Sequence, residues 1–184
     1  MEENDQIYFT LINKCVPLVC MGGCGKSEML RYLVMAEKHK FYKIFCLLPI
    51  YKINNSFNDF IQEKNIFEEW DDEYINELLK VLSVINKGKK CENDKPKNVL
   101  LILDDCCSDT KFHNSKKFEK LFTTGRYFFL SVIISSQYIT NISPSARNNS
   151  EFILVSALNN YNIQILADEY ILGNLNRKTF ILLI

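Results

Sequence analysis

The sequence predicts an α/β fold in which helices cover both faces of a mostly parallel central sheet. Short apolar runs alternate with amphipathic segments of helical length, a pattern typical of buried parallel strands and their connecting helices. One run, residues 16–20, leads through a glycine-rich turn into an amphipathic segment, and another, residues 99–103, ends in two aspartates. Both features fall at the carboxyl ends of predicted strands, the edge where open parallel sheets bind ligands.

The elements around the glycine-rich turn follow from hydrophobic spacing. Residues 15–20 form the first predicted strand, although Pro17 donates no ladder hydrogen bond. Residues 26–40 repeat apolar side chains at helical spacing and predict the first helix. The side chains expected to face the sheet are Met29, Leu30, Leu33, Val34 and Ala36. Residues 43–48, followed by Pro49, predict a second buried strand.

The later elements alternate in the same way. Predicted helices cover residues 71–87, 116–126 and 159–170. Predicted strands cover residues 98–105, 127–136, 152–156 and 179–184. Weaker patterns leave residues 7–14 as a lead-in of helix or edge strand, residues 57–66 ambiguous, and residues 141–150 as a polar loop.

Length and composition indicate one soluble globular domain over residues 1–184. Such a chain can bury a sizeable core, and 22 basic against 22 acidic side chains leave no net charge. The seven cysteines form no C-x-x-C pair, so we expect reduced thiols, no structural zinc and an intracellular location. The acidic N-terminus and the shortness of every apolar run predict neither a signal peptide nor a membrane span.

The glycine-rich turn has the composition of a phosphate-binding loop. Residues 21–27 read Met-Gly-Gly-Cys-Gly-Lys-Ser, close to the pattern G-x-x-x-x-G-K-[ST]. The predicted nucleotide-binding residues are Gly22, Gly23, Cys24, Gly25, Lys26 and Ser27. Lys26 would reach the β- and γ-phosphates of ATP, and the hydroxyl of Ser27 would bind Mg²⁺. Cys20 replaces the first glycine of the pattern and is strained if that position needs a positive φ. The alternative is an ordinary glycine-rich turn with a solvated Lys26.

Two further motifs follow predicted strands. Asp104 and Asp105 end an apolar run in the manner of a Walker B strand, so Asp104 would hold Mg²⁺ and Asp105 would orient or deprotonate the attacking water. The alternative is a strand followed by an Asx-type turn. Gln137 follows another strand as part of Ser-Ser-Gln, where an amide can sense the γ-phosphate or hold the water. The alternative is an amide that bonds only to the adjoining loop.

With these motifs in this order, the sequence resembles the poxvirus-type DNA-packaging ATPases of large DNA viruses and virophages, a branch of the FtsK/HerA superfamily of P-loop NTPases. Beyond the phosphate loop and the acid pair, the resemblance rests on residues 44–51, 122–126, 131–138 and 147–150. It implies a three-layer P-loop fold of the additional-strand, RecA/FtsK-like type. In that fold the Gln137 strand lies between the phosphate-loop strand and the Asp104 strand. The resemblance also makes Arg126 the candidate arginine finger for a neighbouring subunit's ATP, with Arg147 as second choice.

The function that this resemblance implies is ATP hydrolysis by a homo-oligomeric ring that moves viral double-stranded DNA into a capsid. DNA would stimulate turnover, lysines such as Lys89 and Lys90 would grip its backbone, and capsid or portal components would be partners. The expected locations are the host cytoplasm or viral factory, and the virion. Two alternatives stay open: a degenerate ATP-binding assembly subunit without efficient turnover, and a small-molecule kinase, which would lack the inserted Gln137 strand.

Overall fold

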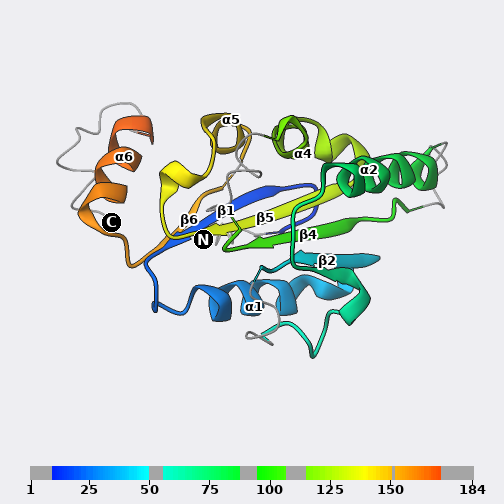
Figure 1. Cartoon of the computed structure of the whole chain (residues 1–184), viewed down its shortest axis with the longest axis horizontal. Coiled ribbons are helices and arrows are strands. Elements are labelled where there is room, and N and C mark those ends of the chain that lie inside the picture. Colours follow the sequence, from blue (N-terminus) through cyan, green and yellow to red (C-terminus); the bar gives the residue numbers. More distant parts are fainter. Residues whose placement is uncertain (1–9, 50–55, 88–94, 107–114, 151, 171–184) are drawn as a thin grey trace, which may run out of the picture.

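A computed structural model describes residues 10–49, 56–87, 95–106, 115–150 and 152–170. Its strands form one six-stranded sheet in the order β3-β2-β4-β5-β1-β6, and every recorded pairing is parallel (Figure 1). The strands are β1 (Cys15–Cys20), β2 (Lys43–Leu47), β3 (Ile66–Phe67), β4 (Val99–Asp104), β5 (Leu130–Ser136) and β6 (Leu154–Ser156). The predicted α/β fold with a parallel sheet is confirmed.

Helices cover both faces of this sheet. They are α1 (Lys26–Glu37), α2 (Asp72–Asn86), α4 (Lys116–Thr124), α5 (Pro144–Asn148) and α6 (Asn160–Tyr170). In Figure 1, α1 lies below the sheet, while α2, α4 and α5 lie above it. Short 3₁₀ turns cover Lys38–Lys40, Glu63–Asn65, Gly125–Phe128 and Ile139–Asn141. No helix among the described residues is long and apolar enough to cross a membrane.

Each face of the sheet has its own core, which explains why the strands are apolar throughout. In β4, Val99, Leu101 and Leu103 join the cluster beneath α2 and α4, whereas Leu100 and Ile102 pack with α1. Successive side chains of a strand point to opposite faces, and both faces are covered here. A continuous apolar run is therefore the expected pattern for such a strand.

The order of the central strands confirms the additional-strand prediction. β5 lies between β4 and β1, pairing Asp104 with Ser135 on one side and Val19 with Ser136 on the other. The phosphate-loop strand and the acid-bearing strand are thus separated by the strand that leads to Gln137. This insertion excludes the topology that the kinase alternative required.

Several local predictions are wrong. The predicted loop at 141–150 contains α5, which Ser143 caps by accepting a hydrogen bond from the Ala146 N–H, with Pro144 in the first turn. The strand predicted from residue 127 begins at Leu130, because Gly125–Phe128 forms a 3₁₀ turn. The two-residue β3 follows residues 57–65, whose sequence pattern is ambiguous, and no local pattern predicts it.

Other predicted features are also corrected. Ala36, expected against the sheet, is exposed, because it lies beyond the face of α1 that carries Leu30 and Val34. The described part of the lead-in, residues 10–14, is neither helix nor strand. The predicted strand at 179–184 and the lysines Lys89 and Lys90 lie outside the described residues.

Candidate nucleotide-binding site

The glycine-rich turn joins β1 directly to α1. Gly23 and Gly25 have φ angles of 76° and 78°, values that favour glycine, and Gly25 is the residue that precedes the helix. Cys20 is the last residue of β1, pairs with Ser156 of β6 and is not among the described residues with positive φ. The strain considered for Cys20 is therefore absent, because the position is extended strand. Burial raises the pKa of the Cys20 thiol above its ordinary value.

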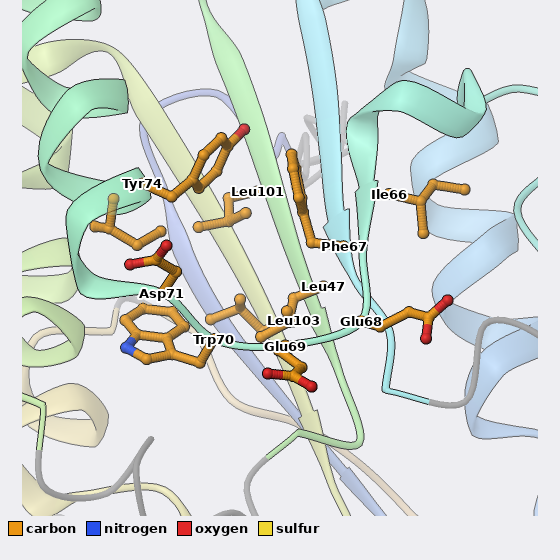
Figure 2. Close-up of a pocket in the computed structure, with 11 residues that line it drawn as sticks. Leu47, Ile66, Phe67, Glu68, Glu69, Trp70, Asp71, Tyr74, Leu101 and Leu103 are labelled. Carbon is orange, nitrogen blue, oxygen red and sulfur yellow. The ribbon is translucent and has the colours of Figure 1, made fainter.

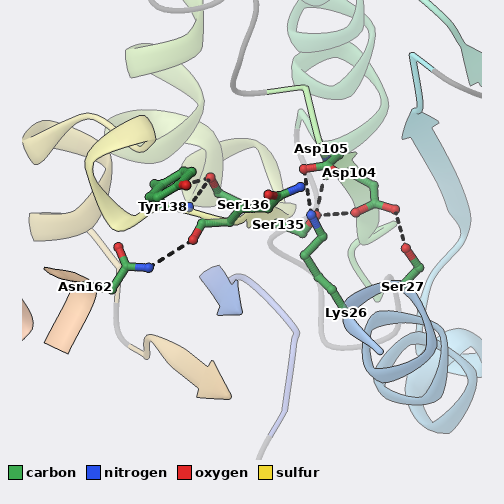
Figure 3. Close-up of polar contacts among 9 residues, drawn as sticks. Lys26, Ser27, Asp104, Asp105, Ser135, Ser136, Tyr138 and Asn162 are labelled. Carbon is green, nitrogen blue, oxygen red and sulfur yellow. Dashed lines mark hydrogen bonds and ion pairs between the residues drawn. The ribbon is translucent and has the colours of Figure 1, made fainter. Parts of the chain in front are cut away.

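The two aspartates after β4 meet the end of the phosphate loop (Figure 3). The Lys26 ammonium lies 2.6 Å from Asp105 Oδ1, and Ser27 Oγ donates to Asp104 Oδ2 over 3.2 Å. Ser135 Oγ donates to the other oxygen of Asp104 and accepts the Asp105 N–H at 3.2 Å. Asp105 itself has φ 56°, a left-handed conformation that Asp tolerates better than most residues. The side chains predicted for phosphate, metal and water thus lie in one connected polar cluster.

The surroundings of Asp104 suit a hard cation. The carboxylate is only 1% exposed, and this burial raises its pKa, although the bonds from Ser135 and Ser27 and the charge of Lys26 act in the opposite direction. A buried carboxylate oxygen beside a serine hydroxyl offers the oxygen ligands that Mg²⁺ prefers. The described residues contain no cluster of three or more His, Cys, Asp or Glu that could hold a metal ion.

Gln137 lies over the phosphate loop. A Cβ built on Gly22 would stand 3.5 Å from Gln137 Oε1, so the amide and the loop are in contact distance. Both residues line a cavity of about 240 Å³ together with Gly25, Lys26, Ser27 and Asp105. The predicted site residues that this cavity brings together come from the loop after β1, the start of α1, and the turns that follow β4 and β5. Cys24 is exposed on the same loop but is not among the residues that line the cavity.

A larger cavity, of about 760 Å³, lies elsewhere and is a poor phosphate site (Figure 2). Its walls are aliphatic and aromatic, and its charged lining residues, Glu68, Glu69 and Asp71, are all acidic. They would repel a triphosphate, whereas the smaller cavity offers Lys26 and a helix N-terminus. Tyr74 in the larger cavity has its pKa raised to about 12 by burial.

The candidate arginine fingers lie outside the small cavity. Arg126 precedes β5 at the amino edge of the sheet, exposed and 5.3 Å from the ring centre of Tyr127. The seven residues of β5 separate it from the site by roughly 20 Å of strand. Arg147 is 5% exposed and donates to the Ile139 and Ile142 carbonyls and to Glu169. Arg147 therefore has a structural role, and Arg126 lies far from the small cavity of its own chain.

Two polar residues near the site were not singled out from the sequence. Ser135 was noted only as part of Ser-Ser-Gln, and its contact with both aspartates depends on the pairing of β5 with β4. Asn162, on α6, is fully buried and donates to the Gln137 carbonyl at 3.0 Å. No local sequence signal marks Asn162, since its partner is 25 residues away.

Relatives known from sequence are viral proteins. The chain is 29% identical over 154 residues to uncharacterized protein 075L of Invertebrate iridescent virus 6, covering 80% of this chain and 55% of that protein. It is 23% identical over 145 residues to uncharacterized protein 015R of Frog virus 3, covering 78% and 44%. The chain thus spans about half the length of these curated relatives.

Solved structures show the same fold at low identity. The genome packaging NTPase B204 of Sulfolobus turreted icosahedral virus 2, in complex with AMPPCP, superposes with a TM-score of 0.59 at 17% identity, covering 85% of this chain and 81% of B204. The cytoplasmic domain of EssC gives a TM-score of 0.66 at 13% identity, covering 92% of this chain and 40% of EssC.

The family assignment follows from the match over almost the whole sequence. The family described as Poxvirus A32 protein matches residues 7–181, a range that includes the phosphate loop, both aspartates and Gln137. The inserted β5 strand and the likeness to a viral genome packaging NTPase agree with this match. The chain therefore belongs to the Poxvirus A32 protein family.

Proposed function

We propose that residues 1–184 act as one ATPase domain of a DNA-translocating motor that packages viral double-stranded DNA. The observation that carries this proposal is the convergence of Lys26, Ser27, Asp105 and Gln137 around one small cavity. Asp104 is hydrogen-bonded to Ser27 at its side. Family membership and the likeness to B204, whose solved complexes hold ATP analogues, support the same reading.

In this proposal the phosphates of ATP occupy the loop at Gly22, Gly23, Cys24 and Gly25, whose N–H groups and helix dipole favour anions. Ser27 and Asp104 would hold Mg²⁺, which when bound neutralises charge on the β- and γ-phosphates. Lys26 contacts those phosphates. Asp105 accepts the proton of, or orients, the attacking water, and Gln137 holds that water against the γ-phosphate.

The ion pair between Lys26 and Asp105 suggests how ATP binding prepares the base. The Lys26 ammonium lies 2.6 Å from the Asp105 carboxylate. A triphosphate offers Lys26 a stronger, more highly charged partner, so Asp105 is released to face the water. Binding of substrate and readiness of the base would then be coupled through one lysine.

The position of Arg126 supports a ring arrangement. Because this arginine lies at the opposite edge of the sheet, it can stabilise charge on a γ-phosphate only in a neighbouring subunit. An arginine finger of this kind contributes roughly 10³-fold or more to turnover. Contacts with double-stranded DNA and with capsid or portal components complete the proposed motor, which would act in the host cytoplasm or viral factory and enter the virion.

ATP turnover with Mg²⁺, with and without double-stranded DNA, tests this function. We expect DNA-stimulated turnover in the native chain and its loss in Lys26→Ala and in Asp105→Asn. Lys38→Ala, which removes an exposed lysine beyond the end of α1, is the matched control and should turn over normally. Tight ATP binding without turnover under any condition would overturn the motor and select the degenerate assembly subunit.

A further inference from the structure

We propose that Asn162 is a positioning residue that holds Gln137 over the phosphate loop. The inference rests on the proposed function of Gln137 and goes beyond it, because it assigns a role to a residue of α6 that never touches the nucleotide. Nothing in the polar cluster around Lys26 requires this helix. The Asn162 side chain is linked to the site through the turn that follows β5.

The amide of Asn162 clamps the backbone on both sides of Tyr138. Figure 3 shows the first of the two bonds, the one that Asn162 donates. Its Nδ2 donates to the Gln137 carbonyl over 3.0 Å, and its Oδ1 accepts the Ile139 N–H at 3.1 Å. The side chain is 0% exposed, so water cannot replace either bond. Donor and acceptor are both matched, an arrangement that an ionised carboxylate, which only accepts, cannot provide.

Asn162 is itself fixed by the first turn of α6. Its N–H donates to Asn159 Oδ1 over 2.8 Å, and the Ile163 N–H donates to the Asn159 carbonyl at 3.1 Å. This is the geometry of a capped helix start. Two residues before Asn159, the Ala157 carbonyl accepts the N–H of Met21 in the phosphate loop at 3.3 Å. The clamp on Gln137 and the phosphate loop are therefore tied to the same short segment.

The turn itself leaves Gln137 little freedom while the clamp is in place. Ser136 Oγ accepts the Tyr138 N–H at 3.3 Å and donates to the Tyr138 carbonyl over 3.0 Å. Gln137 is thus held by the strand before it, by the bond of Asn162 to its own carbonyl, and by the bonds of Ser136 to Tyr138, the residue that follows it. Without Asn162, the Gln137 carbonyl and the Ile139 N–H lose their partners, and the Gln137 side chain is no longer aimed at the cavity. A displacement of about 1 Å in a catalytic group can lower a rate about 100-fold.

Amide hydrogen exchange tests the clamp without any need for turnover. In Asn162→Ala we expect the peptide containing Ile139 to exchange at least about tenfold faster, because its N–H loses a buried acceptor. The phosphate loop and α1 should keep their native protection. Leu166→Ala is the matched control, since Leu166 is buried on the same helix and has no bond to the turn. Native protection of the Ile139 peptide in Asn162→Ala overturns the clamp.

A double-mutant cycle tests whether the clamp acts through Gln137. We expect Asn162→Ala to lower kcat roughly 10- to 100-fold with an unchanged dissociation constant for ATP, which also reports that the variant is folded. In a Gln137→Ala background the same change should have no further effect. Asn162→Ser, which is less disruptive to packing, should behave in the same way, whereas Leu166→Ala should leave kcat unchanged.

The outcomes separate this inference from the function on which it rests. If the fold-reductions in kcat caused by Asn162→Ala and Gln137→Ala multiply in the double variant, Asn162 does not act through Gln137. The inference is then overturned, while the proposed ATPase activity is unaffected. If Gln137→Ala turns over normally, the assigned role of Gln137 fails and the inference fails with it. If the native chain does not turn over at all, the proposed function is overturned alone, and the exchange result decides the clamp.

Discussion

Ser135 hydrogen-bonds to both aspartates at the end of β4. Its hydroxyl donates to the Asp104 carboxylate and accepts the Asp105 N–H, so a single oxygen fixes the proposed metal ligand and the proposed base. Hydrogen bonds to a metal-binding carboxylate orient it and keep its charge, and removal of such a partner typically costs 10- to 100-fold in metal affinity or activity. Ser135 thus has a larger expected effect than its small size indicates.

Ser135→Ala is accordingly expected to raise the Mg²⁺ concentration that gives half-maximal turnover about tenfold or more. Ser131→Ala is the matched control, because Ser131 is buried on the same strand and its hydroxyl accepts the Asn13 N–H, far from the aspartates. Titration of ATP turnover against Mg²⁺ in both variants decides the matter. Equal Mg²⁺ dependence in the native chain and in Ser135→Ala would show that the hydroxyl is dispensable.

Tyr74 gives a second residue-level prediction, on stability in alkali. Burial raises the pKa of its phenol to about 12, whereas an unfolded tyrosine ionises near pH 10. The folded state therefore keeps a proton that the unfolded state loses, so this stability is present below pH 10 and is lost as the pH rises to about 12. Denaturant unfolding under reducing conditions at several alkaline pH values should show a smaller loss of stability in Tyr74→Phe than in the native chain. An equal loss of unfolding free energy with pH in Tyr74→Phe and in the native chain would contradict the prediction.

The site residues that local sequence motifs identify are those in continuous stretches. Lys26 and Ser27 follow the glycines, Asp104 and Asp105 end an apolar run, and Gln137 follows another. The sequence predicted their place at one edge because the carboxyl ends of parallel strands coincide. The contacts made by Ser135 depend on strand register, and those of Asn162 on how α6 packs, so no short pattern could reveal them.

At the level of elements, Ser115 joins two helices above the sheet. Its hydroxyl accepts the N–H groups of Lys117 and Phe118 at the start of α4, and it donates to the carboxylate of Asp72 in the first turn of α2. The sequence analysis found both helices from their periodicity. It missed α5, whose single turn is too short to show a period and is indicated only by the Ser-Pro pair at its start.

Loss of the Ser115 hydroxyl should therefore destabilise the fold by about 1–3 kcal/mol, since it removes a helix cap and a bond to a carboxylate. Equilibrium unfolding of Ser115→Ala measures this change in the free energy of unfolding. Ser83→Ala is the comparison, because Ser83 is exposed on α2 and its hydroxyl donates only to the Lys80 carbonyl. A change below about 0.5 kcal/mol in Ser115→Ala, the range of ordinary surface substitutions, would refute the bridge between the helices.

At the scale of the whole molecule, the parallel sheet separates the proposed ATP site from Arg126. Every strand runs the same way, so all carboxyl ends share one edge and the turn before β5 lies at the other. A subunit built in this way carries an ATP site and an arginine on opposite edges. Head-to-tail contacts that repeat around a closed ring can bring such unlike surfaces together.

This separation predicts complementation between two inactive variants. Arg126→Ala keeps an intact ATP site but supplies no finger, whereas Asp105→Asn supplies the finger but has no base. In rings of equal, randomly mixed subunits, about a quarter of the interfaces pair an intact site with an intact finger, so mixing should restore turnover that neither variant shows alone. Lys26→Ala mixed with Asp105→Asn is the control and should stay inactive, because both substitutions damage the same site. If the Arg126→Ala chain alone turns over at the native rate, the arginine has no part in the reaction. If the mixture recovers no activity, Arg126 acts within its own subunit and not on a neighbour.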